Sequence, residues 1–140
     1  MKEPILKNQK GSVILEALIA ILIFSIGILA IIGLQALSIS NSAAAKYRSD
    51  ASLLANQIIG QMWVGENATL VTNFSSPSGA RYLTWTNSVK STLPGVALSP
   101  LYLPTITFAG NTVTVTVFWR QASETTAHQY VTTAVINNSI

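Results

Sequence analysis

The sequence contains no cysteine, a single histidine and only five acidic residues in 140 positions. The absence of cysteine excludes disulfide bonds and zinc–thiolate sites. A Ser-His-Asp arrangement would need His128 together with Asp50, which lies in a helical segment, and no Gly-x-Ser-x-Gly sequence accompanies them. The acids are scattered, so they predict no carboxylate pair and no metal cluster, and no glycine-rich phosphate loop occurs. We therefore expect no enzymatic activity, cofactor or metal, and we interpret His128 as a surface residue without a catalytic role.

Charge is also scarce, because charged residues make up 9% of the chain against about 25% in an average soluble domain. The formal net charge of +3 comes largely from Lys2, Lys7 and Lys10 at the N-terminus. Without residues 1–11, five basic residues face four acidic ones, which leaves +1. A nucleic-acid-binding protein needs a basic stripe on its folded part, so this charge distribution argues against a nucleic-acid partner.

The apolar residues are concentrated in one long run. Between Glu16 and Gln35 lie 18 residues, of which only Ser25 is polar. At a rise of about 1.5 Å per residue this run spans roughly 27 Å, close to the hydrocarbon thickness of about 30 Å. The lysines that precede the run predict a single membrane pass with a cytoplasmic N-terminus. A cleaved secretory signal peptide, with Ala43-Ala44-Ala45 as its site, is the alternative, but its apolar region would be shorter, about 7–15 residues.

The helical pattern continues past the apolar run. No proline occurs from residue 43 to residue 63, and apolar residues recur at spacings of three and four: Tyr47, Ala51, Leu54, Ile58 and Met62. We predict one helix from about Val13 to about Val64, whose first half is apolar all round. Its second half is amphipathic and must pack against another part of the chain.

The remainder reads as a small sheet joined by loops. We predict a strand at 81–86, a hairpin from strands 105–108 and 112–119, and a last strand at 129–136. Residues 66–80 and 88–104 are rich in Ser, Thr, Asn, Pro and Gly and are predicted to be loops that carry specificity. An antiparallel sheet on the amphipathic half of the helix gives an α+β domain. Three tryptophans are interpreted as core or interface anchors: Trp63, Trp85 and Trp119.

Glu16 is the one ionisable residue inside the apolar stretch. A charged side chain at the centre of a bilayer costs about 2.5–3.5 kcal/mol on insertion scales, and less near the interface. Glu16 could lie at headgroup level, in the first turns of the helix, where the dipole favours a negative charge. Alternatively, its carboxylate pairs with a cation inside an assembly.

The segment Lys10-Gly11-Ser12-Val13-Ile14-Leu15-Glu16, followed by an apolar helix, resembles the class III signal of type IV prepilins and pseudopilins. The resemblance implies a pilin-like fold and three segments: a leader peptide at 1–11, a transmembrane or filament-core helix at 12–37, and a periplasmic globular domain at 38–140. It implies cleavage by prepilin peptidase between Gly11 and Ser12, N-methylation of Ser12, and a role of Glu16, the fifth mature residue, in subunit register. The sequence departs from the family at Ser12, where phenylalanine is typical.

A closer similarity, strong over about residues 10–62, is to the type IV pilus modification protein family PilV. It is carried by Ser25-Ile-Gly-Ile-Leu, by Gly33-Leu-Gln and by the stretch from Tyr47 to Met62. It implies a low-abundance minor pilin that resides in the bacterial inner membrane and enters the extracellular pilus. Its implied partners are the major pilin, other minor pilins, prepilin peptidase, the assembly platform in the inner membrane and a tip adhesin. Two alternatives stay open: a minor pseudopilin of a type II secretion system, and a plain membrane-anchored periplasmic binding domain.

Overall fold

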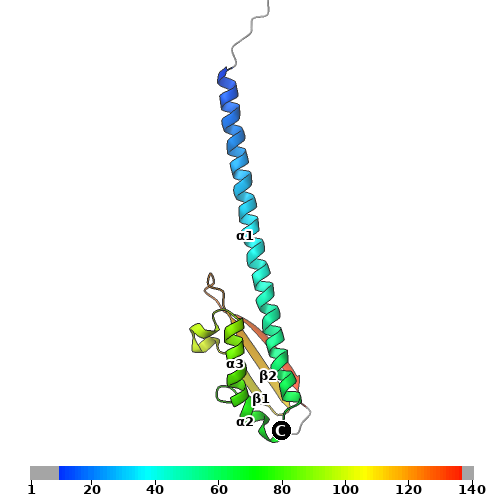
Figure 1. Ribbon diagram of the computed structural model, residues 1–140. Coiled ribbons are helices and arrows are strands. Elements are labelled where there is room, and N and C mark those ends of the chain that lie inside the picture. Colours follow the sequence, from blue (N-terminus) through cyan, green and yellow to red (C-terminus); the bar gives the residue numbers. More distant parts are fainter. Residues whose placement is uncertain (1–9, 137–140) are drawn as a thin grey trace, which may run out of the picture. The chain divides into compact units, whose positions relative to one another are not determined.

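The computed structural model describes residues 10–136, and the chain divides into two compact units, Met1–Ala43 and Ala44–Ile140. Helix α1, Lys10–Trp63, contributes to both units (Figure 1). The predicted single helix from about Val13 to about Val64 is therefore confirmed. In the first unit, the side chains of residues 12–42 are exposed or nearly so, and α1 is long and apolar enough to cross a membrane.

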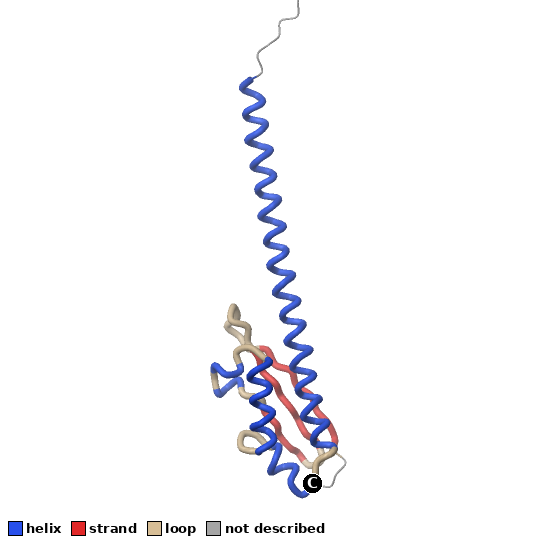
Figure 2. The backbone as a smooth tube through the Cα atoms, viewed as in Figure 1, coloured by secondary structure: helices blue, strands red, loops and turns tan. Residues whose placement is uncertain are grey.

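The second unit is an α+β domain built around a three-stranded antiparallel sheet. The strands are β1 (Thr105–Ala109), β2 (Thr112–Trp119) and β3 (His128–Val135), in the order β1-β2-β3. The helices are the C-terminal part of α1, the short α2 (Leu70–Phe74) and α3 (Ala80–Thr92), with 3-10 turns at 67–69, 96–98 and 100–102. Figure 2 shows α1 and α3 running beside the strands. The prediction of an α+β domain is confirmed at this level.

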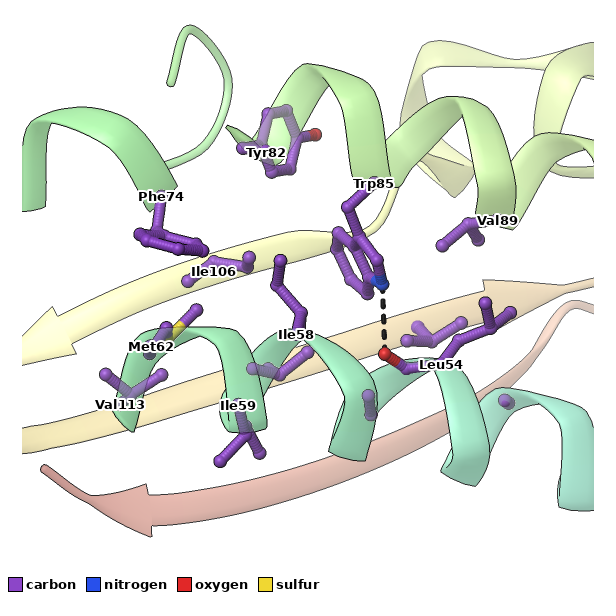
Figure 3. Packing of buried hydrophobic residues seen from close by; sticks show 14 of the residues in the cluster. Leu54, Ile58, Ile59, Met62, Phe74, Tyr82, Trp85, Val89, Ile106 and Val113 are labelled. Carbon is purple, nitrogen blue, oxygen red and sulfur yellow. Dashed lines mark hydrogen bonds between the residues drawn. The ribbon is translucent and has the colours of Figure 1, made fainter. Parts of the chain in front are cut away.

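The core lies between these two helices and the inner face of the sheet. The predicted stripe on α1 is confirmed, since Ala51, Leu54, Ile58 and Met62 are buried and Tyr47 packs against the cluster. Figure 3 shows Leu54, Ile58 and Met62 of α1 meeting side chains of α3 and of the strands. Strand β2 alternates strictly, with its valines and Trp119 buried and its threonines partly exposed.

The hairpin prediction is also confirmed. Ala109 pairs with Thr112, and Gly110 adopts a φ of 56° between them. This left-handed conformation is readily adopted by glycine and only rarely by other residues. The last strand is confirmed as well, starting one residue earlier than predicted, at His128.

The prediction of a strand at 81–86 is wrong, because these residues belong to α3. Their aromatic and threonine content is typical of strands. The buried positions, however, are Tyr82, Trp85, Thr86 and Val89, which follow a helical spacing of three and four. A helix places all four side chains on the core at once, whereas a strand would turn alternate ones outward. The loops predicted at 66–80 and 88–104 likewise contain α2, both ends of α3 and the 3-10 turns.

Candidate functional site

The first candidate site is the start of α1, where Gly11 and Ser12 occupy its second and third residues. Ser12 and Glu16 lie four positions apart in a continuous helix. They therefore share one face of the helix, about 6 Å apart along its axis. Leu15, Ile19 and Ile23 belong to the same face, and all of these side chains are exposed. The site is therefore one carboxylate and one small hydroxyl on an apolar helix surface.

Glu16 has no hydrogen-bond or ion-pair partner among the described side chains of residues 12–136. The other polar side chain of the apolar run is satisfied locally, because the Ser25 hydroxyl donates to the Ile21 carbonyl at 2.7 Å. Glu16 is thus the group in this stretch that calls for a partner from outside the described part of the chain. Burial of an unpaired carboxylate is costly, so an environment that removes a charged Glu16 from water has to supply a cation or hydrogen-bond donors.

The helix dipole stabilises Glu16 little in this chain. Within the described residues, α1 has no acidic residue in its first turn, and Glu16 lies in the second turn. The effect of the dipole falls off within the first turn. If the chain were cleaved after Gly11, Glu16 would be the fifth residue of a helix that starts at Ser12, which is still its second turn.

A second candidate site lies in the globular unit, around His128. Its Nε2 atom lies 2.9 Å from Glu124 Oε2, and its ring stacks on Trp119 with centroids 5.6 Å apart. The hydrogen bond with His128 is the main cause that lowers the pKa of the Glu124 carboxyl, and the Gln121 backbone amide adds to it. Arg48 joins Trp119 and His128 in lining a groove of about 290 Å³.

The remaining lining of this groove is Ala44 and Ala45. Sequence reasoning placed His128 at the surface, where it is found, but missed its contacts with Glu124 and Trp119. The register of β2 with β3, which pairs Trp119 with His128, was the signal that could have revealed the stack. Among the described residues, no group of three or more His, Asp or Glu side chains could hold a metal ion.

The three predicted anchors differ from one another. Trp85 is buried, and its indole N–H donates to the Leu54 carbonyl of α1 at 2.9 Å. Trp119 is buried, and its indole N–H has no acceptor within the described chain. Trp63 is 58% exposed and donates to the Val135 carbonyl at 3.4 Å. Trp85 and Trp119 are therefore core residues, whereas Trp63 lies at the surface beside β3.

No protein-family model, curated protein or solved structure matches this chain.

Proposed function

We propose that this protein is a minor type IV pilin of the PilV type, made as a prepilin and cleaved between Gly11 and Ser12. The observation that supports this most is the course of α1. One uninterrupted helix contains the candidate cleavage site, Glu16, the apolar run and the amphipathic stripe that packs on a small antiparallel sheet. The apolar half of such a helix can lie in a membrane, and its amphipathic half packs in the globular domain. This combination suits a subunit that moves from a membrane into the core of a filament. In this proposal the fold is pilin-like.

The same layout accounts for the exposed apolar surface of residues 12–39. Large hydrophobic side chains are exposed on every side of the helix here, for example Ile14, Phe24 and Leu29. Such a surface needs lipid or other apolar helices around it. In this proposal, the bacterial inner membrane covers it first and neighbouring pilin helices cover it after assembly.

Glu16 acts in assembly. Cleavage creates an α-amine on Ser12, with an ordinary pKa near 7.7–8.0, or its N-methylated form. Both this cation and the Glu16 carboxylate need partners in a filament core. Pairing of Glu16 in one subunit with the terminal amine of another satisfies both groups and sets the axial register. In this proposal the subunit helps to prime assembly near the pilus tip. Its partners are prepilin peptidase, the assembly platform of the inner membrane, the major pilin, other minor pilins and a tip adhesin.

The decisive experiment determines the N-terminus of the protein from sheared surface filaments by intact mass and N-terminal sequencing. We expect residues 1–11 to be absent and Ser12 to be first. A mature protein that begins at Met1 or after Ala45 would overturn the proposal. Recovery of the cleaved protein from a secretion pseudopilus, but not from pili, would favour the type II secretion alternative.

The role of Glu16 is tested separately with Glu16→Ala and Glu16→Gln. Both variants should be made, inserted and cleaved normally, yet be depleted at least several-fold from purified filaments. The Gln variant retains shape and hydrogen bonding but not charge, so it isolates the ion pair. Wild-type incorporation of both variants would show that Glu16 has no pairing role.

A further inference from the structure

Strand β3 lies at one edge of the sheet, and its sequence has few features that would prevent another strand from pairing with it. It has eight residues, His128–Val135, and contains no lysine, arginine, acid, proline or glycine. Proteins normally protect edge strands with charges, prolines, bulges or short length, because a free edge is a template for pairing with another chain. None of these devices is present in β3.

The pattern of hydrogen bonds between β2 and β3 shows which backbone N–H and C=O groups of β3 point away from the sheet. The Ile136 amide donates to the Asn111 carbonyl at 2.8 Å, and the register continues through Val113↔Ala134 and Val115↔Thr132. In an antiparallel ladder bonded pairs alternate with non-bonded ones. The even-numbered residues of β3 therefore bond to β2, and the N–H and C=O groups of residues 129, 131, 133 and 135 point away from the sheet.

Only one of these outward positions is occupied by the described part of the chain. Trp63 Nε1 donates to the Val135 carbonyl at 3.4 Å, whereas no hydrogen bond within residues 10–136 reaches the outward groups of Gln129, Val131 or Thr133. The opposite edge of the sheet differs. Strand β1 has five residues, and Ser76 closes it by donating its amide to the Ile106 carbonyl and accepting the Ile106 amide on its hydroxyl, both at 3.3 Å.

The side chains beside the open edge are uncharged. Strand register places Thr105, Thr116 and Val131 in one row of the outer face, and Thr107, Thr114 and Thr133 in the next. Val131 is 50% exposed. A strand added beyond β3 would extend these rows, so its own outward side chains should be small, β-branched or otherwise uncharged.

We propose that residues 129–133 of β3 accept an extended, uncharged segment of a different protein as a fourth strand. Main-chain hydrogen bonds would supply the affinity, as in other cases of strand addition. Six outward groups, one N–H and one C=O from each of three residues, match a partner segment of about five residues.

A second copy of this chain fits the edge poorly, an argument that rests on the proposed function. Alongside β3, α1 runs in the same direction: Ser52 Oγ lies 3.3 Å from Tyr130 Oη, and Trp63 contacts Val135 further on. Antiparallel pairing of two β3 strands would point these helix segments in opposite directions, although both continue into membrane helices. Parallel pairing of two identical edges cannot be symmetric, because each bonded residue then lies opposite a non-bonded one.

The test uses the full-length protein in detergent micelles and a blocked synthetic peptide with the sequence of residues 128–135. This peptide has no acidic or basic residue other than histidine and favours an extended conformation. Because it has no membrane anchor, it can pair with β3 in either the parallel or the antiparallel direction. Amide hydrogen exchange is measured by NMR. We expect the peptide to slow exchange at residues 129, 131 and 133 at least tenfold, and to leave residues 130, 132 and 134, which are bonded to β2, unchanged.

Two variants make the test specific. Val131→Pro removes one outward N–H without breaking the ladder to β2, a position where edge strands tolerate proline, and should abolish the protection. Val131→Lys replaces it if the proline variant does not fold, and should weaken peptide binding at least tenfold. Leu83→Lys, at an α3 residue that is also 50% exposed, is the matched control and should bind as the wild type does.

Each outcome decides the proposal. No binding, or binding without alternating protection, would overturn it. Alternating protection that rises with protein concentration in the absence of peptide would show a second copy as the occupant and overturn the assignment to a different protein. Cleavage after Gly11 and recovery from filaments are scored independently, so failure of the edge proposal leaves the pilin proposal intact, and the reverse also holds.

Discussion

Replacement of Trp85 by phenylalanine tests how α3 is held on α1. The Trp85 indole is 4% exposed and donates to the Leu54 carbonyl, as Figure 3 shows. Phenylalanine loses the N–H and part of the ring volume. The Leu54 carbonyl keeps its helical partner, the amide of Ile58, so it is not left unpaired. The lost hydrogen bond is worth about 1 kcal/mol, and a void of roughly 40 Å³ adds about 1 kcal/mol.

The expected loss of about 2 kcal/mol lowers Tm by about 10 °C for a domain of roughly 100 residues. The other two tryptophans serve as matched controls. Trp63→Phe removes a mostly exposed ring and should cost less than about 0.5 kcal/mol. Trp119→Phe loses buried volume, which destabilises the domain. It also removes an indole N–H that has no acceptor among the described residues, and this gain of about 1 kcal/mol or more offsets part of the loss. Its cost should therefore lie below that of Trp85→Phe.

Thermal unfolding of the full-length protein in detergent, followed by far-ultraviolet circular dichroism, measures all three variants. We expect the decrease in Tm to be largest for Trp85→Phe, smaller for Trp119→Phe and smallest for Trp63→Phe. A Trp85→Phe variant that melts within 3 °C of the wild type, or a Trp119→Phe variant that loses as much, would refute the hydrogen-bond argument.

Three further predictions concern the same domain. Gly95→Ala should destabilise the protein by more than about 2 kcal/mol in denaturant unfolding, because φ is 78° and a Cβ would lie 2.5 Å from the Arg120 carbonyl, whereas Gly110→Ala meets open space and should cost about 1 kcal/mol. Because the pKa of Glu124 is lowered on folding from its ordinary value of 4.5, its stabilising contribution is present above that value and is lost as the pH falls through the lower pKa of the folded state. Glu124→Gln should therefore flatten the decline of Tm between about pH 5 and pH 3. A fragment of residues 38–140 should remain in solution and melt cooperatively with mixed helix and strand, and a largely disordered spectrum would show that the sheet needs another subunit.

The candidate assembly site could be proposed from the sequence because its signals are local. Gly11, Ser12 and Glu16 were singled out because they and the apolar run after them resemble a prepilin signal, and their role stays a prediction. The structure adds that Ser12 and Glu16 share one face of α1. The surroundings of His128 could not be predicted in the same way, since Trp119 and Glu124 reach it through strand pairing and a loop.

The sequence by itself determined four features: one helix from about Val13 to about Val64, its apolar first half, its amphipathic second half and the hairpin around Gly110. In the amphipathic half and in the hairpin, the repeat of apolar residues matches only one backbone conformation, and the apolar first half is too long to be a strand. Only the tertiary structure decided that residues 80–92 form a helix, because their strand-like composition is overridden by burial of four side chains against α1 and the sheet. Only strand order decided that β3 is an open edge, because whether a backbone group is paired depends on which strand lies beside it.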